Sequence, residues 1–262
     1  MKRDRKSVDD RQMNILNTIR EKGDISVEEL AEKCQVSLMT IRRDLASLDE
    51  KGMIRRYHGG ATAVDQRGPI TPEEETALCR REIARYAAEF IEDGDSLFIN
   101  GSATALGVLE YTGEKKIKVM TNNARAITMP HANGISLALT GGELREHVMV
   151  GDYVMQNLLR LEADKTFIGC AAVYDDGEFS YNIPTEIGIN ESMIARTKGE
   201  LFILADHTKI RKRKDLTQQY GSCIYDCPVT LITDEMADPE CIDSLRKVLS
   251  NVVVISIPRE NS

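Results

Sequence analysis

The chain has 262 residues, of which 42% are hydrophobic, with 34 Lys and Arg against 42 Asp and Glu. This composition is ordinary for a globular protein of one or two domains. No apolar run approaches the ~18 residues of a membrane span, and residues 1–30 lack the apolar core of a signal peptide. The six cysteines are scattered, with no disulfide framework. These features argue against membrane and secreted classes and predict a cytoplasmic protein with reduced thiols.

Charge is unevenly distributed along the chain. Residues 1–68 carry 14 basic and 12 acidic side chains, a net charge of +2. The remaining residues carry 20 basic and 30 acidic side chains, a net charge of −10. Because a polyanion attracts the first part and repels the second, this asymmetry favours a nucleic-acid contact in the first part alone.

Two helices are predicted near the start of the chain. Apolar residues recur at helical spacing after Asp10, and Gly23 then suits a left-handed helix end. These apolar residues are Met13, Ile15, Leu16 and Ile19. Ser26 and Glu29 have the spacing of a capping box, in which each side chain satisfies a free backbone N–H. We expect the second helix to end at about Lys33.

A third helix follows after a four-residue connection, with Ser37 as its predicted N-cap. The predicted buried face consists of Leu38, Ile41, Leu45 and Leu48. Two short helices joined by a tight turn form the helix-turn-helix pattern, whose second helix fits the DNA major groove. After it, residues 53–61 form a strand-like run that ends in a Gly-Gly turn, which predicts a β-wing.

Arginine can bind guanine edges or phosphates, threonine can contact a phosphate or a thymine methyl, and basic wing residues suit phosphates. The residues predicted to contact DNA are Ser37, Met39, Thr40, Arg42, Arg43, Lys51, Arg55, Arg56 and His58. A plain three-helix bundle with solvated arginines has the same periodicity, so spacing alone leaves that alternative open. Asp44 could orient one of the arginines, although a solvated acid is equally compatible.

The order of the residues is more specific than their periodicity. Four motifs, at 27–32, 36–45, 48–52 and 56–61, closely resemble the N-terminal winged helix-turn-helix of the DeoR family of bacterial transcription regulators. The resemblance implies a DNA-binding domain over residues 8–64, with the helix-turn-helix proper at about 25–44.

A second domain is predicted over residues 72–258, after a linker at 65–71. Pro72 and three glutamates open its first helix. Short apolar runs then alternate with helical stretches, at 96–99, 118–120, 135–139, 165–168, 201–204, 229–232 and 252–257. Continuous apolar strands separated by helices predict an α/β domain with a mainly parallel sheet covered on both faces.

Ligands of such sheets bind beyond the carboxyl ends of the strands, and the residues there are polar or glycine-rich. A Gly-Ser-x-Thr turn can offer N–H and hydroxyl groups to a phosphate. Any one of these turns is explained equally well by the Gly, Asn and Thr residues that the backbone needs at a strand end. Five such turns together favour a small polar ligand. The effector-binding residues predicted at these turns are Asn100, Gly101, Ser102, Thr104, Thr121, Asn122, Gly141, Gly142, Glu143, Gly169, Asp206 and Lys209.

The resemblance to the DeoR family continues through this domain, at 121–122, 141–145, 163–169 and 205–209. It implies a fold similar to sugar-phosphate isomerases and deaminases, and a domain that senses phosphorylated sugars. It also implies three further effector-binding positions, Lys165, Glu186 and Asn190. Two positions depart from the family pattern. Asn100 replaces an Asp, and Asn190 stands where a Lys follows the glutamate at 186. The second change removes a cation that could pair with phosphate. Two alternatives therefore stay open: the effector is a different or less charged molecule, or the pocket has lost its response to a ligand.

The sequence therefore predicts a ligand-responsive regulator, a repressor of a carbohydrate operon, which binds operator DNA as a homodimer or homotetramer. The alternative is a sugar-phosphate isomerase or deaminase fused to a DNA-binding head, with Glu143, Glu186, Asp206 and His207 as acid–base candidates. The chain has no phosphate-binding P-loop and no Gly-x-Ser-x-Gly motif. Its histidines are isolated from any zinc-ligand pattern, so we predict no cofactor, no metal and no catalytic residue.

Overall fold

The computed structural model describes residues 11–19, 22–51, 53–57, 59–63, 71–130, 132–181, 184–213 and 226–258. The chain divides into two compact units, Met1–Thr71 and Pro72–Ser262. None of the described helices combines the length and apolar character needed to cross a membrane.

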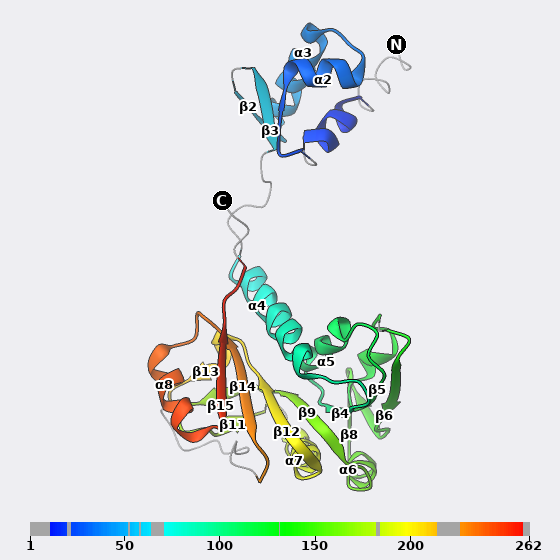
Figure 1. Ribbon diagram of the computed structural model, residues 1–262, viewed down its shortest axis with the longest axis vertical. Coiled ribbons are helices and arrows are strands. Elements are labelled where there is room, and N and C mark those ends of the chain that lie inside the picture. The colour runs from blue at the N-terminus through cyan, green and yellow to red at the C-terminus, as the bar shows by residue number, and fades with distance from the viewer. Residues whose placement is uncertain are drawn as a thin grey trace. The chain divides into compact units, whose positions relative to one another are not determined.

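The described residues of the first unit form three helices and a small antiparallel sheet (Figure 1). Residues 11–19 are helical, and Gly23 follows with a φ of 75°. The remaining elements are β1 (Asp24–Ser26), α2 (Val27–Cys34), α3 (Leu38–Glu50), β2 (Ile54–Tyr57) and β3 (Gly60–Ala63). The sheet order is β1-β3-β2, and the β2–β3 hairpin confirms the predicted wing. This architecture confirms the predicted winged helix-turn-helix.

The helix faces differ from the sequence prediction at two positions. One apolar cluster joins Ile15 of the first helix, Leu30 of α2 and Leu45 of α3, together with their buried neighbours. Met13 and Leu38 were expected in this core, but their exposed fractions are 61% and 42%. Each has helical spacing, yet each lies at the margin of its apolar stripe, where the neighbouring helices do not cover it.

Side-chain caps begin both helices of the helix-turn-helix. Ser26 Oγ accepts a hydrogen bond from the Glu29 N–H at 3.1 Å, and Ser37 Oγ accepts one from the Thr40 N–H at 3.2 Å. The first cap is half of the predicted capping box. Among the described residues the carboxylate of Glu29 does not complete it, because this group pairs with Lys22. The N-cap at Ser37 confirms the predicted start of α3.

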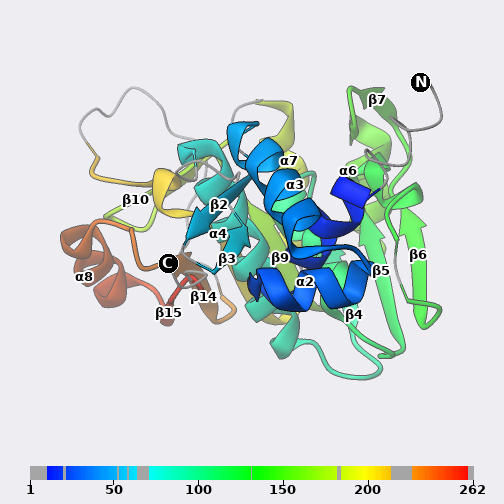
Figure 2. The same ribbon diagram turned by 90° about the horizontal axis from the view of Figure 1, so that it is seen from above.

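The second unit is built on a seven-stranded sheet of order β15-β14-β12-β9-β4-β5-β6, in which every pair is parallel. The strands are β4 (Ser96–Ile99), β5 (Ile117–Thr121), β6 (Ile135–Leu139), β9 (Ala163–Gly169), β12 (Thr197–Leu204), β14 (Val229–Asp234) and β15 (Asn251–Ile255). All seven predicted strands are confirmed. Figure 2 shows β5 and β6 at one side of this unit and β15 with α8 (Pro239–Val248) at the other.

Alternating strand residues face two different layers of helices. On one face, Leu97 and Phe202 pack in a cluster with α4 (Pro72–Ala87) and α5 (Ala103–Gly107). On the other face, Phe98 packs in a cluster with α6 (Asp152–Leu158) and α7 (Thr185–Ala195), while Ile203 packs with α8. The sheet is therefore buried on both faces, which explains why its strands read as continuous apolar runs.

Shorter elements lie beyond the carboxyl ends of the strands. Two are the paired strands β7 (Glu143–Arg145) and β8 (Val148–Val150), and three form the small sheet of β10 (Ala172–Tyr174), β11 (Phe179–Ser180) and β13 (Ile210–Arg211). The 3₁₀ turns η3 (Ala124–Ile127) and η4 (His207–Lys209) follow strands, whereas η1 (Ala88–Phe90) and η2 (Val108–Tyr111) lie between a helix and the start of the next strand. The β7–β8 hairpin, the small sheet and η4, with α4, α5 and α7, surround the edge of the sheet where the predicted ligand residues lie.

Candidate functional site

Helix α3 presents the side chains predicted to read DNA. Met39 is 73% exposed, and Arg42 and Arg43 are also exposed. Thr40 is half-buried, and its hydroxyl lies 2.9 Å from the hydroxyl of Ser37. Ser37 therefore has a structural role at the start of the helix, whereas the two arginines are free to project from it.

Asp44 is buried and holds α3 against the first helix. Its carboxylate accepts hydrogen bonds from Arg11, at 2.6 Å from Nε and 3.2 Å from Nη2, and from Gln12 Nε2 at 3.4 Å. Its exposed fraction is 3%. Asp44 is thus neither a solvated acid nor a partner of the neighbouring arginines, because its side chain faces the core of the unit.

The wing residues differ in their surroundings. Arg55 and Arg56 are both exposed on β2, and they leave the hairpin on opposite faces because successive strand residues alternate. Lys51 instead donates a hydrogen bond from Nζ to Gln12 Oε1 at 3.1 Å, so it braces the first helix. His58, the remaining predicted contact, lies outside the described residues.

Tyr57 fixes the wing to β1. Its Oη donates a hydrogen bond to Asp24 Oδ1 at 2.6 Å. A Cβ at Gly60 would lie 2.3 Å from that Oη and 2.6 Å from the carbonyl oxygen of Ile25. Only glycine fits at this position, so the Gly-Gly turn allows the tyrosine to close over the hairpin.

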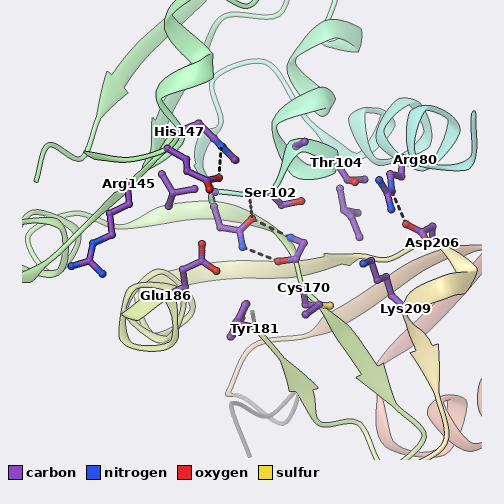
Figure 3. Close-up of a pocket in the computed structure, with 18 residues that line it drawn as sticks. Arg80, Ser102, Thr104, Arg145, His147, Cys170, Tyr181, Glu186, Asp206 and Lys209 are labelled. Carbon is purple, nitrogen blue, oxygen red and sulfur yellow. Dashed lines mark hydrogen bonds and ion pairs between the residues drawn. The ribbon is translucent and has the colours of Figure 1, made fainter. Parts of the chain in front are cut away.

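The second unit contains a cavity of about 590 Å³ beyond the carboxyl ends of β4, β9 and β12. Figure 3 shows the side chains around it. The predicted effector residues that line it are Asn100, Gly101, Ser102, Thr104, Gly169, Glu186, Asp206 and Lys209. The lining residues that the sequence analysis did not select are Arg80, Ala103, Arg145, Glu146, His147, Val148, Cys170, Ala171, Tyr181 and Leu204.

The side chain of Asn100 joins the end of β4 to the end of β9 by hydrogen bonds. Its Nδ2 donates to Gly169 O and to Asn190 Oδ1, each at 2.9 Å. Its Oδ1 accepts from the N–H groups of Gly169 and Ser102, at 3.1 and 3.2 Å. Because an amide side chain has two donor hydrogens and two acceptor sites, all four are used inside the protein. Asn100 therefore shapes the cavity wall and leaves no hydrogen-bonding group for a ligand.

Asn190 lies behind the cavity wall and does not line the cavity. It is 2% exposed, and its Nδ2 donates to the carbonyl oxygen of Glu186 at 2.7 Å. Its Oδ1 is the acceptor for Asn100. Position 190, in the second turn of α7, therefore lies against Asn100 and not among the residues that line the cavity.

Ser102 and Gly169 form a close contact at the wall of the cavity. A Cβ at Gly169 would lie 2.0 Å from Ser102 Oγ, so glycine is required beside this serine. Ser102 Oγ also accepts a hydrogen bond from the Ala105 N–H at 3.4 Å and caps α5. Ser102 and Thr104 thereby bring two hydroxyl groups to one side of the cavity (Figure 3).

Arg80 and Asp206 form an ion pair on the same side of the cavity as Thr104, away from Arg145 and Glu186 (Figure 3). Arg80 Nε donates to Asp206 Oδ2 at 2.7 Å, and Asp206 is 3% exposed. Burial alone raises the pKa of Asp206, but hydrogen bonds from Thr208 and Arg80 outweigh burial and hold that pKa below its ordinary value. Lys209, the neighbouring cation, has no ion pair with any other described residue.

Glu186 faces the cavity from α7 (Figure 3). Burial raises the pKa of its carboxyl group, and no described residue donates a hydrogen bond to that group. Cys170 also lines the cavity, and burial raises the pKa of its thiol to about 12. The thiol is therefore protonated near neutral pH, whereas Glu186 is available as a hydrogen-bond acceptor when ionised.

The other predicted effector residues lie away from the cavity for identifiable reasons. Thr121 and Asn122 are buried and hydrogen-bond the backbone of neighbouring residues, at Asn123 and Met149. Lys165 pairs with Asp95 at 2.7 Å near the amino end of its strand, the opposite edge of the sheet.

The Gly141-Gly142 turn and Glu143 form a separate loop and hairpin. Both glycines have positive φ, at 72° and 104°, and a Cβ at Gly142 would lie 2.6 Å from the Val150 carbonyl oxygen. Glu143 is exposed and pairs with Arg145 at 3.3 Å. These residues shape the hairpin that brings Arg145 and His147 to the cavity, but they do not line it themselves.

One cluster outside the cavity has the composition of a metal site. Cys79, His207 and Asp234 place possible ligand atoms within 4.8 Å of one another. Asp234 already accepts hydrogen bonds from the His207 and Met236 N–H groups, and it lies 3.0 Å from His207 Nδ1. Burial raises the pKa of the Cys79 thiol to about 12, so it is protonated near neutral pH. These contacts join His207 and Asp234 to each other and to the adjoining loop.

Two family models match the chain. The DeoR-like helix-turn-helix domain matches residues 11–67, and the DeoR C terminal sensor domain matches residues 75–235. Among solved structures, ribose 5-phosphate isomerase from Plasmodium falciparum overlaps 52% of this chain and 54% of its own, at 13% identity. The TM-score of 0.38 is too low to inform the site.

Curated relatives match across most of their length. The lactose phosphotransferase system repressor of Lactococcus lactis subsp. lactis is 32% identical over 240 residues, covering 87% of this chain and 92% of that protein. The transcriptional repressor CsqR of Escherichia coli is 31% identical, with coverages of 74% and 77%. The glycerol-3-phosphate regulon repressor of Haemophilus influenzae is 29% identical, with coverages of 78% and 82%. These relatives are repressors, not enzymes, and the chain belongs to the DeoR family of transcription regulators.

Proposed function

We propose that this protein is a repressor whose affinity for operator DNA changes when a phosphorylated sugar or related compound binds in the cavity of the second unit. The observation that carries the proposal is the arrangement of polar groups around that cavity. The guanidinium of Arg80, the ammonium of Lys209 and the hydroxyls of Ser102 and Thr104 suit a phosphate. The carboxylate of Glu186 suits the hydroxyl groups of the attached polyol.

Related proteins support this class of effector. One is named as a repressor of a lactose phosphotransferase system and another as a repressor of a glycerol-3-phosphate regulon. The loss of a lysine at position 190 does not argue against a phosphate here, because that side chain lies behind Asn100. Arg80 and Lys209 provide the positive charge instead.

On the DNA side, we propose that Arg42 and Arg43 contact bases or phosphates in the major groove, with Arg55 and Arg56 on the flanking backbone. Their exposure on α3 and β2 supports this assignment. Repressors of this architecture read two-fold symmetric operators as symmetric oligomers, and we infer a homodimer or homotetramer for this chain.

The effector is tested by thermal unfolding of the full chain. The panel is glycerol 3-phosphate, ribose 5-phosphate, fructose 6-phosphate and glucose 6-phosphate, each beside its unphosphorylated counterpart and inorganic phosphate. A ligand that binds only the folded state raises Tm by mass action, and we expect this for one or more phosphorylated compounds alone. A rise with the free sugar and none with its phosphate would contradict the proposal.

DNA recognition is tested with Arg42→Ala and Arg43→Ala. An operator is first selected from random duplexes with the unmodified protein, and Kd is then measured by fluorescence anisotropy. Each substitution should weaken binding by about 1–3 kcal/mol if the arginine makes a bidentate base contact. Arg246→Ala, on the exposed face of α8, is the matched control and should leave Kd unchanged. Operator affinity that is unaltered in both arginine variants would rule out α3 as the recognition helix.

A further inference from the structure

The charged side chains that line the cavity gather at two ends. Figure 3 shows Arg80, Asp206 and Lys209 together on one side, with Glu186 and Arg145 on the other side. The first group has two cations and one acid, and this acid is already paired, because Arg80 Nε donates to Asp206 Oδ2 at 2.7 Å. A ligand that spans this cavity of about 590 Å³ therefore meets a positive end and an end that contains Glu186.

The carboxyl group of Glu186 has no partner among the described residues. This side chain is half-buried in the first turn of α7 and faces the cavity (Figure 3). No described residue donates a hydrogen bond to the carboxyl group or forms an ion pair with it, and burial accounts for its raised pKa. The described parts of the protein therefore do not balance the negative charge of Glu186.

The neighbouring side chains of α7 do not supply the missing positive charge. On a helix the residues three and four positions later lie beside a side chain, and for Glu186 these are Ile189 and Asn190. Ile189 is apolar and 1% exposed. Asn190 Nδ2 donates to the backbone carbonyl oxygen of Glu186 at 2.7 Å, and its Oδ1 accepts from Asn100 at 2.9 Å. Neither neighbour is charged, and neither donates to the carboxylate of Glu186.

The basic groups of the β7–β8 hairpin are directed elsewhere. Arg145 Nε donates to Glu143 Oε1 at 3.3 Å, and Figure 3 shows the guanidinium pointing away from Glu186. His147 Nδ1 lies 3.9 Å from a carboxylate oxygen of Glu146, a residue that lines the same cavity and adds a second acid to it. A cation that balances Glu186 would thus come with the ligand.

We propose that the effector carries an ammonium group as well as a phosphate, and that Glu186 binds the ammonium. This inference rests on the proposed function, in which Arg80 and Lys209 bind the phosphate. A hydroxyl group could donate one hydrogen bond to Glu186 but would leave its charge unbalanced, whereas an ammonium has three donors and the opposite charge. The ligand class is therefore the amino sugar phosphates, in which several atoms separate the amine from the phosphate.

The test measures Kd of the full chain by isothermal titration calorimetry at neutral pH. One series of ligands consists of the 6-phosphates of glucose, glucosamine and N-acetylglucosamine, and a second series consists of the matching galactose compounds. Acetylation converts the amine to a neutral amide. Because every compound of a series has the same phosphate, a difference within the series reports the group at one carbon. Free glucosamine and galactosamine complete the panel.

In at least one series the amino compound should bind about 10- to 150-fold more tightly than the parent sugar phosphate, the range for a hydrogen bond to a charged group. The N-acetyl compound should lose this advantage. Glu186→Gln should reduce the advantage by about tenfold or more. Glu186→Asp should keep part of it, because the charge remains, and Glu191→Gln, exposed on the same helix, should keep all of it.

The outcomes separate this inference from the proposed function. Equal Kd values for the amino and parent compounds would overturn the inference and leave the proposed function standing. An unchanged advantage in Glu186→Gln, with Tm showing that the variant is folded, would also overturn it. If the free amino sugar binds as tightly as its phosphate and Glu186→Gln abolishes this binding, the proposed function fails and the ammonium contact holds. If no compound of the panel binds, both proposals fail.

Discussion

At the scale of residues, the two departures from the family pattern are one structural feature. Asn100 and Asn190 are 90 positions apart, yet their side chains share a 2.9 Å hydrogen bond. An Asp and a Lys at these positions would form an ion pair, and two amides replace it with a neutral contact. The net charge of the pair is zero in both cases, so the phosphate site gains no repulsion from the change.

This pairing predicts non-additive substitutions. Asn100→Asp would place a carboxylate oxygen against the acceptors Gly169 O and Asn190 Oδ1, and Asn190→Lys would bury an unpaired ammonium. Each should lower the free energy of unfolding, by roughly 1–3 kcal/mol or more. In the double variant the two charges pair, so urea unfolding should show a favourable coupling of about 1–3 kcal/mol. Additive losses would contradict the contact.

The ionised carboxyl group of Glu186 should lower the stability of the fold and strengthen ligand binding. Burial raises its pKa, so the folded protein holds this proton more tightly than the unfolded chain, and stability falls as pH rises through this interval. Glu186→Gln should therefore raise Tm at neutral pH and have little effect below the ordinary glutamate pKa of about 4.3. It should also weaken binding of the phosphorylated compound. Glu191→Gln, exposed on the same helix, is the control, and a Tm difference independent of pH would refute the prediction.

At the scale of elements, the position of α3 depends on a buried ion pair. Asp44→Ala removes the acceptor for Arg11 and Gln12, which join the first helix to α3. We expect the DNA-binding unit to lose about 1.5–3 kcal/mol, the range for hydrogen bonds to charged groups. Denaturation followed by operator binding would measure this loss, while ligand binding in the second unit should not change. Asp49→Ala, exposed on the same helix, should have no effect; equal behaviour of both variants would exclude the bracing role.

Element boundaries were predictable where the local pattern was strong. The strands β4 and β6 match their predicted ranges, because each apolar run is bounded by polar or glycine residues. The caps at Ser26 and Ser37 were also predictable, since a helix start has a local signature. Exposure was less predictable at Met13 and Leu38, since periodicity identifies an apolar stripe but not the width that neighbouring helices cover.

At the scale of the whole molecule, the net positive charge lies on the DNA-binding unit and the net negative charge on the second unit. A symmetric oligomer should read half-sites about one helical turn, or a multiple of it, apart. Inserting about five base pairs between the half-sites should weaken binding by tenfold or more, and inserting about ten should restore part of the affinity. Mobility-shift titrations measure both, and equal Kd for all three spacings would indicate that the chain binds as a monomer.

The sequence by itself determined the two-unit organisation, the winged helix-turn-helix and the parallel sheet. These depend on periodicity, caps and turns, which are properties of neighbouring residues. It also located Ser102, Asp206 and Lys209, because ligands of parallel sheets gather at the carboxyl ends of strands, and the family resemblance added Glu186.

Only the tertiary structure decided which of the polar residues share the cavity. Lys165 lies on a cavity-forming strand but at its amino end, and Asn190 lies one layer behind the wall. Arg80 comes from a helix that precedes the first strand of the sheet, where no rule about strand ends applies. These positions depend on strand order, helix packing and hydrogen bonds between residues far apart in the chain, and such long-range contacts leave no signal in the local pattern.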